Sequence, residues 1–216
     1  MPRGALTELD LLNAAKELAS RDQILASILH QHGPPPLWAR KPGFATLVNI
    51  ILEQQVSLVS AASIFARVRQ NTIPFNPHRL IELGEGHLKS LGLTRQKTAY
   101  CLDLSRSLAE KRLQLSKLSR MDDEDARAAL MQVKGIGRWS ADIYLLMALL
   151  RPDVWPANDL ALALAVRDLK QLNATPNQEQ LQTMAAAWRP FRSVAARMFW
   201  QYYLARQKAA RERRAK

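Results

Sequence analysis

The sequence predicts an all-α protein, and three observations support this fold class. Apolar residues recur with helical spacing along nearly the whole chain, whereas alternating, strand-like stretches are nearly absent. Prolines and glycines interrupt the pattern, as in the GPPP run at 33–36, which forms a stiff extended connector. At 216 residues, the chain is long enough for one large domain or two small ones with a buried core.

The individual helices follow from this periodicity and from the breaks between them. We expect them over 7–19, 23–31, 44–70, 77–83, 86–91, 95–110, 122–133, 138–150, 160–171, 178–187 and 191–210. Further proline breaks lie at 73–77 and 151–156, and Asn76 and the pair Asn158-Asp159 are suited to cap the helices that follow.

The formal net charge of +12 indicates a polyanionic partner. A basic tail alone would be the simpler explanation. Residues 206–216 carry six Lys/Arg against Glu212 and contribute +5, which leaves +7 on the rest of the chain. The positive excess is therefore not confined to the end of the chain.

Cysteine and histidine usage restricts the chemistry. Cys101 is the single cysteine, so an internal disulfide framework and any four-cysteine zinc or iron–sulfur site are excluded. The four histidines show no metal-ligand spacing, and we expect no protein-ligated catalytic metal. No apolar run of membrane-spanning length and no N-terminal signal is present, so we expect a soluble intracellular protein.

Two helical segments are joined by a Gly-x-Gly turn in the run VKGIGRWSA at 133–141. Glycine tolerates a positive φ and lacks a Cβ that would block close approach. The amides of Gly135, Gly137 and Arg138 would converge at the start of the following helix, where N–H groups and the helix dipole favour an anion such as a DNA phosphate. Ordinary helix connections share this pattern, so the run alone leaves both interpretations open.

Asp159 also has two interpretations, and they do not exclude each other. Aspartate is a preferred helix cap because its carboxylate accepts backbone N–H bonds of the first turn. The same bonds would keep the carboxylate anionic. An anionic group of this kind is suited to stabilise positive charge in a reaction.

Aromatic and amide side chains give two further signals. Trp139 lies just inside the helix after the turn, and Trp188 and Trp200 bracket the last helix. These rings belong either to the core, as most helix tryptophans do, or to a pocket that stacks on an extruded base. The run LEQQVS at 52–57 is polar within an apolar stretch. It is either a helix break whose side chains enter the DNA stack, or a loop or exposed helix edge.

Taken with the run WRPFRS at 188–193, these elements resemble, in the same order, the motifs of the helix-hairpin-helix (HhH-GPD) DNA glycosylases, and most closely the AlkA-like branch, 3-methyladenine DNA glycosylase II. The resemblance implies a two-lobed helical fold with the active-site cleft between the lobes. One lobe would span 44–153 and end in the hairpin. The other would combine 1–43 with 154–216 and carry the basic tail.

The resemblance also implies roles for particular residues. Asp159 matches the catalytic aspartate of the family, and Trp139 and Trp200 match aromatic residues of the base pocket. Gln55 falls at the position of the side chain that enters the DNA stack. Because relatives that cleave the strand carry a lysine nucleophile where this chain has Trp139, we expect no lyase activity.

The hairpin would bind DNA through Lys134, Gly135, Gly137 and Arg138, which match its phosphate-binding turn. In this family the hairpin also binds a monovalent cation through backbone carbonyls. Here, those carbonyls would belong to Met131, Val133 and Ile136, and the ion would be a structural Na⁺ or K⁺. No other cofactor is implied.

The activity implied is that of a monofunctional glycosylase of base excision repair, which releases alkylated purines such as 3-methyladenine and 7-methylguanine from double-stranded DNA. We expect it to act as a monomer, away from membranes, in the cytoplasm with the nucleoid or in the nucleus of a eukaryote. Leu160 replaces a tyrosine beside the catalytic aspartate of the closest relatives, so the lesion preference stays open. The alternatives are a non-catalytic protein that binds damaged DNA, a glycosylase for deaminated or oxidised bases, and a helical interaction protein.

Overall fold

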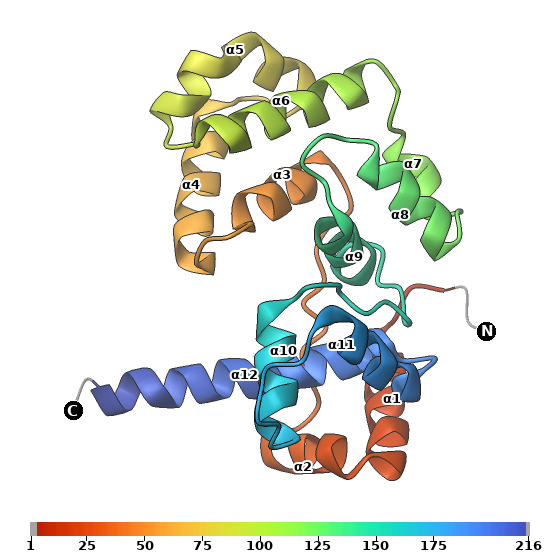
Figure 1. Cartoon of the computed structure of the whole chain (residues 1–216). Helices are drawn as coiled ribbons and strands as arrows, with labels where there is room; N and C mark the ends of the chain where they lie inside the picture. The colour runs from red at the N-terminus through yellow and green to blue at the C-terminus, as the bar shows by residue number, and fades with distance from the viewer. Residues whose placement is uncertain (1–3, 215–216) are drawn as a thin grey trace. The chain divides into compact units, whose positions relative to one another are not determined.

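The computed structural model describes residues 4–214, and every regular element in that range is a helix (Figure 1). This confirms the all-α prediction. Residues 1–3 and 215–216, the latter part of the basic tail, lie outside the described residues. None of the helices within 4–214 is both long and apolar enough to cross a membrane.

The chain divides into two compact units. The continuous unit spans Arg40–Leu149, and the terminal unit combines Met1–Ala39 with Leu150–Lys216. The sequence predicted a division at 44 and 153, a few residues further along the chain. Each unit has its own set of buried apolar side chains.

The helices of the continuous unit are α3 (Phe44–Glu53), α4 (Leu58–Asn71), α5 (Pro77–Ser90), α6 (Arg95–Ala109), α7 (Leu115–Leu118), α8 (Asp123–Met131) and α9 (Arg138–Met147). Those of the terminal unit are α1 (Glu8–Arg21), α2 (Gln23–His32), α10 (Leu160–Leu169), α11 (Gln178–Ala185), the 3₁₀ turn η1 (Ala186–Trp188) and α12 (Arg192–Arg214).

The predicted helix over 44–70 is wrong, because the structure breaks it between Glu53 and Leu58. Gln55 has a left-handed φ of 57°, and the Ser57 side chain accepts the Ser60 N–H and so caps α4. A helix cannot continue through a residue in that conformation. The separation expected between 83 and 86 is present as a kink, where Gly84 has a φ of 71° inside α5.

The core of each unit consists of apolar helix faces. In the continuous unit, α3 buries Leu47, Val48 and the run 50–52 almost completely, and it packs against α4, α6 and α9. In the terminal unit, the rings of Trp155, Trp188 and Phe199 pack with centroids 4.9–6.2 Å apart. Trp188 is 2% exposed, so the core interpretation holds for this tryptophan.

Candidate active site

Asp159 is the N-cap of α10 and is only 8% exposed. Its Oδ1 accepts the Leu162 N–H at 2.9 Å, which is the capping bond that the sequence predicts. The preceding Asn158 has a φ of 57°, a left-handed conformation that asparagine adopts more readily than most residues. The turn at Asn158 and the cap together fix the direction of the carboxylate.

A second donor reaches the same oxygen from another helix. The indole Nε1 of Trp200, on α12, donates to Asp159 Oδ1 at 3.1 Å, and the Trp200 side chain is itself almost buried. The Trp38 ring meets the Trp200 ring edge to face, with centroids 6.3 Å apart and an interplanar angle of 64°. The structure therefore brings together Asp159 and Trp200 and adds Trp38, which the sequence analysis missed.

The WRPFRS run fixes the segment that leads to Asp159. Arg192 Nε and Nη2 donate to the two carboxylate oxygens of Asp153 at 2.8 and 3.0 Å. The Ser193 hydroxyl accepts the Val154 N–H at 2.9 Å and donates to the Val154 carbonyl at 3.1 Å. Since these bonds tie the start of α12 to residues 153–154, they hold the loop before α10 in place.

Arg197 fixes the connector at 33–39, which carries Trp38, to α12. Its Nε donates to the Leu37 carbonyl at 2.9 Å, and its Nη1 donates to the Ser193 carbonyl at 3.0 Å. Burial lowers the pKa of the Arg197 guanidinium to about 10, so the group remains charged at neutral pH. No pattern in the sequence identifies this residue, because its role depends on a contact across 160 positions.

The Gly-x-Gly turn lies in the continuous unit, between α8 and α9. Gly135 has a φ of 90°, and a Cβ at this position would overlap the Tyr100 ring. Gly137, in contrast, is extended, with φ −86° and ψ −178°, and it caps α9 without any side-chain hydrogen bond. Glycine is therefore required by the backbone conformation of the turn at Gly135 and not at Gly137.

The remaining hairpin residues surround this turn. Lys134 and Arg138 have exposed side chains, and the Lys134 N–H donates to the Asp103 carboxylate at 2.9 Å. The Val133 carbonyl accepts the Ile136 N–H at 3.0 Å across the turn. Met131 is the last residue of α8, where helix carbonyls have no partner further along the helix.

The turn between α3 and α4 contains Gln54 and Gln55, whose side chains point in different directions: Gln55 is exposed and Gln54 is half-buried. The apolar residues after Gln55, Val56 and Val59, are also exposed, by 42% and 75%. Gln54 turns inward, where its Nε2 donates to the Gly135 carbonyl at 2.8 Å and to the Ser140 hydroxyl at 2.9 Å. Gln54 thus joins this turn to the hairpin, a role that sequence reasoning did not assign.

A buried lysine supports the same turn. The Lys97 Nζ donates to the Leu52 carbonyl at 2.6 Å, in the last turn of α3, and burial lowers the pKa of this amine. Cys101, one helical turn further along α6, is buried, and burial raises its pKa to about 12. A buried thiol that stays protonated is chemically inert.

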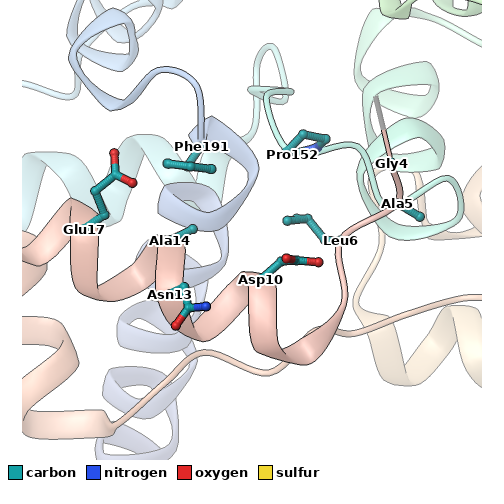
Figure 2. A pocket seen from close by; sticks show the side chains of 9 residues that line it. All are labelled: Gly4, Ala5, Leu6, Asp10, Asn13, Ala14, Glu17, Pro152 and Phe191. Atoms are coloured by element: carbon teal, nitrogen blue, oxygen red, sulfur yellow. The ribbon is translucent and has the colours of Figure 1, made fainter. Parts of the chain in front are cut away.

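Trp139, the other predicted pocket residue, lies near the start of α9 and is half-buried. It belongs to the continuous unit, whereas Asp159 and Trp200 belong to the terminal unit. A separate cavity of about 250 Å³ lies in the terminal unit, lined by residues 4–6, α1, Pro152 and Phe191 (Figure 2). None of the predicted site residues lines it. Within 4–214, no three His, Cys, Asp or Glu side chains gather as a metal site.

Comparison with known proteins identifies two similar proteins in Bacillus subtilis. The YfjP protein of Bacillus subtilis is 29% identical over 184 residues, which cover 82% of this chain and 64% of that protein. The DNA-3-methyladenine glycosylase of the same organism is 27% identical over 169 residues, which cover 73% of this chain and 56% of that protein. The chain therefore spans less than two thirds of the length of these two relatives.

A solved structure shares the fold. The 3-methyladenine DNA glycosylase of Schizosaccharomyces pombe, in complex with abasic DNA, superimposes with a TM-score of 0.77. The match has 22% sequence identity and covers 88% of this chain and 95% of that one. A family model described as "HhH-GPD superfamily base excision DNA repair protein" matches residues 48–192, which include the hairpin and Asp159. The resemblance read from the motifs is confirmed: the chain belongs to the HhH-GPD superfamily of base excision DNA repair proteins.

Proposed function

We propose that the protein is a monofunctional DNA glycosylase that hydrolyses the N-glycosidic bond of alkylated purines in double-stranded DNA. The observation that carries this proposal is the carboxylate of Asp159, nearly buried at the start of α10 and held by the Leu162 N–H and the Trp200 indole, in a chain of this family. The name of the B. subtilis relative, DNA-3-methyladenine glycosylase, supports the substrate class.

The proposed reaction requires little from the protein beyond stabilisation of the positive charge that develops on the sugar. Alkylation at N3 or N7 makes a purine cationic, so the base departs as a neutral molecule with the electrons of the bond to C1′. Positive charge develops on the sugar, and Asp159 stabilises it and orients the water that adds to C1′ and loses a proton. By analogy with other electrostatic stabilisers in water-poor sites, this interaction is worth about 3 kcal/mol or more, roughly a hundredfold in rate.

Strand cleavage is not part of the proposed activity. A glycosylase with lyase activity forms a Schiff base between C1′ and an amine of the protein. Position 139, where a lysine would stand in such relatives, holds a tryptophan, and an indole nitrogen cannot form that adduct. Base release should therefore leave an intact strand with an abasic site.

The proposed contacts to the phosphates and to the DNA stack come from the continuous unit. The amides of Gly135, Gly137 and Arg138 would hold phosphates without reading the sequence, and Lys134 would add a charge. Gln55, exposed on its turn, would fill the space left by the flipped nucleotide.

The extruded base would lie against two of the chain's tryptophans. The rings of Trp139 and Trp200 would contact it. Because the Trp200 N–H is directed to Asp159, this ring offers the base its π surface and not a hydrogen bond.

A monovalent cation at the hairpin is part of the proposal. The carbonyls of Met131, Val133 and Ile136 lie at the C-terminal end of α8 and in the turn after it, where the helix dipole is negative. The Val133 carbonyl accepts one hydrogen bond, from the Ile136 N–H, and a carbonyl oxygen has a second lone pair. Bound Na⁺ or K⁺ would add positive charge beside the phosphates.

The test is release of bases from methylated duplex DNA, resolved by chromatography, for wild type and Asp159→Asn. The matched control is Asp122→Asn, which makes the same change at an exposed N-cap of α8. We expect wild type and Asp122→Asn to release 3-methyladenine or 7-methylguanine, and Asp159→Asn to be at least about a hundredfold slower. Nicks should appear only after alkali.

Other outcomes would select the alternatives. Tight binding of damaged duplex by wild type without release of any base would support a non-catalytic binding protein. Release of uracil, hypoxanthine or oxidised bases in place of alkylpurines would assign a different lesion class to the same scaffold. Normal turnover by Asp159→Asn would remove Asp159 from the mechanism.

A further inference from the structure

The last helix, α12, extends well beyond the part that builds the site. Its first half carries Ser193, Arg197 and Trp200, and it packs against α1, α2 and α10. The anchoring contacts continue to Arg206, which forms an ion pair with Asp168 of α10. Beyond Arg206 the helix continues to Arg214, and Figure 1 shows this blue end running on past α10. We call residues 207–214 the C-terminal arm.

The arm carries cations with no partner among the described residues. Lys208, Arg211 and Arg213 are exposed, and within 4–214 none of them forms an ion pair or a side-chain hydrogen bond. The one acidic residue of the arm is Glu212; the sequence of the arm ends with a further basic residue, Arg214, and Lys216 follows it. The tail identified from the sequence is thus largely a helix continuous with the site, and not a detached peptide.

The helical spacing divides these cations between two sides of the arm. At about 100° per residue, Lys208 and Arg211 lie together, on the side of the helix opposite Arg206. Because Arg206 is paired with α10, that opposite side faces away from the helix to which α12 is anchored. Lys208 and Arg211 therefore form an outward-facing basic pair.

Helix stability alone does not account for this pair. Like charges three residues apart repel one another and weaken a helix slightly. Cations within the last turn do interact well with the helix dipole, but the effect falls off within that turn. Lys208 lies more than one turn before the end of α12 at Arg214. A polyanion bound to this side would offset the repulsion.

The reach of the arm identifies which polyanion fits. A rise of about 1.5 Å per residue puts Lys208 about 12 Å and Arg211 about 16 Å along the helix axis from Trp200, the residue bonded to the Asp159 carboxylate. At about 3.4 Å per base pair, these distances correspond to roughly four to five base pairs of duplex. The DNA that presents a lesion to Asp159 therefore has phosphates within reach of a rigid arm that starts at the site.

We propose that the C-terminal arm binds the phosphate backbone of the substrate duplex, several base pairs to one side of the lesion, through Lys208 and Arg211. This inference rests on the proposed function, since it requires a duplex at Asp159. It adds a one-sided contact that reads no bases, so it raises affinity and on-rate without changing the lesion preference.

The test compares Lys208→Gln/Arg211→Gln with a charge-matched control, Lys117→Gln/Arg120→Gln, which removes two exposed cations of the continuous unit at the same spacing. Binding is measured by fluorescence anisotropy on a duplex of about 30 base pairs with a central tetrahydrofuran abasic analogue, between about 50 and 200 mM salt. Helix content is checked by circular dichroism.

For the arm variant we expect the slope of log affinity against log salt to fall by about 1.8, and the affinity to fall roughly tenfold or more at 0.1 M salt. Glu212→Gln should change affinity in the opposite direction. Trimming the duplex to about three base pairs on one side of the analogue should abolish the difference between wild type and the arm variant, and trimming the other side should not. This asymmetry is the signature of an arm of fixed reach.

Equal losses for the arm and control variants, or a difference that persists on both trimmed duplexes, would reduce the effect to net charge and overturn the proposal. Base release from methylated DNA is measured in parallel. Release by wild type with an unchanged salt slope in the arm variant would refute the arm alone. An arm-dependent slope without base release would refute the glycosylase proposal and leave the arm contact standing.

Discussion

Removing the Gln54 side chain should disconnect the turn after α3 from the hairpin. The amide donates two hydrogen bonds, at 2.8 Å to the Gly135 carbonyl and at 2.9 Å to the hydroxyl of Ser140, which is 2% exposed. At about 1 kcal/mol net for each bond, Gln54→Ala should reduce the free energy of unfolding by about 2 kcal/mol. Ser140→Ala removes one of the bonds and should cost about 1 kcal/mol.

A double-mutant cycle isolates the contact between the two side chains. If the bond between Gln54 and Ser140 carries the effect, the double variant should lose about 1 kcal/mol less than the sum of the single variants. Urea unfolding followed by circular dichroism measures these free energies. The control is Gln31→Ala, which breaks an exposed glutamine–serine bond of 3.1 Å to Ser27 and should change stability by less than about 0.5 kcal/mol.

The Gln54→Ala variant should also lose DNA affinity to a greater extent than it loses turnover rate. Gln54 fixes the turn that presents Gln55 and touches the hairpin carbonyl, but it lies in the continuous unit, whereas Asp159 lies in the terminal unit. We expect Gln54→Ala to raise KM roughly tenfold while kcat at saturating DNA changes little. Additive free energies in the cycle, or a loss confined to kcat, would refute this assignment.

Three further predictions follow from other contacts. Asp159→Ala should destabilise the protein by about 2 to 3 kcal/mol, because it removes a helix cap and leaves the buried Trp200 indole N–H unpaired. Asp159→Asn should cost less than about 1 kcal/mol. Thermal unfolding of the two variants checks this difference. Gly135→Ala should weaken duplex binding at least about tenfold in a titration, because the alanine meets both a positive φ and the Tyr100 ring. Burial raises the pKa of Cys101 from 9.0 to about 12, so the contribution of the buried thiol to folding stability is complete below pH 9 and declines above it. The thiol should react with iodoacetamide at pH 8.5 only after the protein unfolds.

The helical fold could be predicted from the sequence because each helix carries its own signals. Asn76 caps α5 and Asp159 caps α10, as their residue types indicated. The long helix expected over 44–70 was the clear error. The polar run at 52–57 had already offered a helix break as one interpretation, and the Ser57 cap is a local feature. The bonds of Gln54 to Gly135 and Ser140, more than eighty positions away, are contacts that a local pattern cannot reveal.

The candidate site could likewise be predicted only in part from the sequence. Capping identified Asp159, but the Trp200 indole that shares its oxygen was predicted only as a ring against the base. Trp38 and Arg197 carried no signal, since their roles come from contacts between the connector at 33–39 and α12. Sequence reasoning thus found the groups whose role is local and missed those that position them.

The hydrogen bonds to Asp159 from the Leu162 N–H and the Trp200 indole bear on how the carboxylate would act in catalysis. Bonds from Leu162 N–H and Trp200 Nε1 are present before any substrate arrives, so they stabilise the anion equally in the ground state and in the transition state. Interactions of that kind do not by themselves accelerate a reaction. Their contribution is orientation: the carboxylate needs no rearrangement when positive charge develops on the sugar, and a preorganised charge in a water-poor site is worth far more than one in solvent. If Asp159 acts as proposed, the bonds that cap α10 would also orient the charge that acts in catalysis.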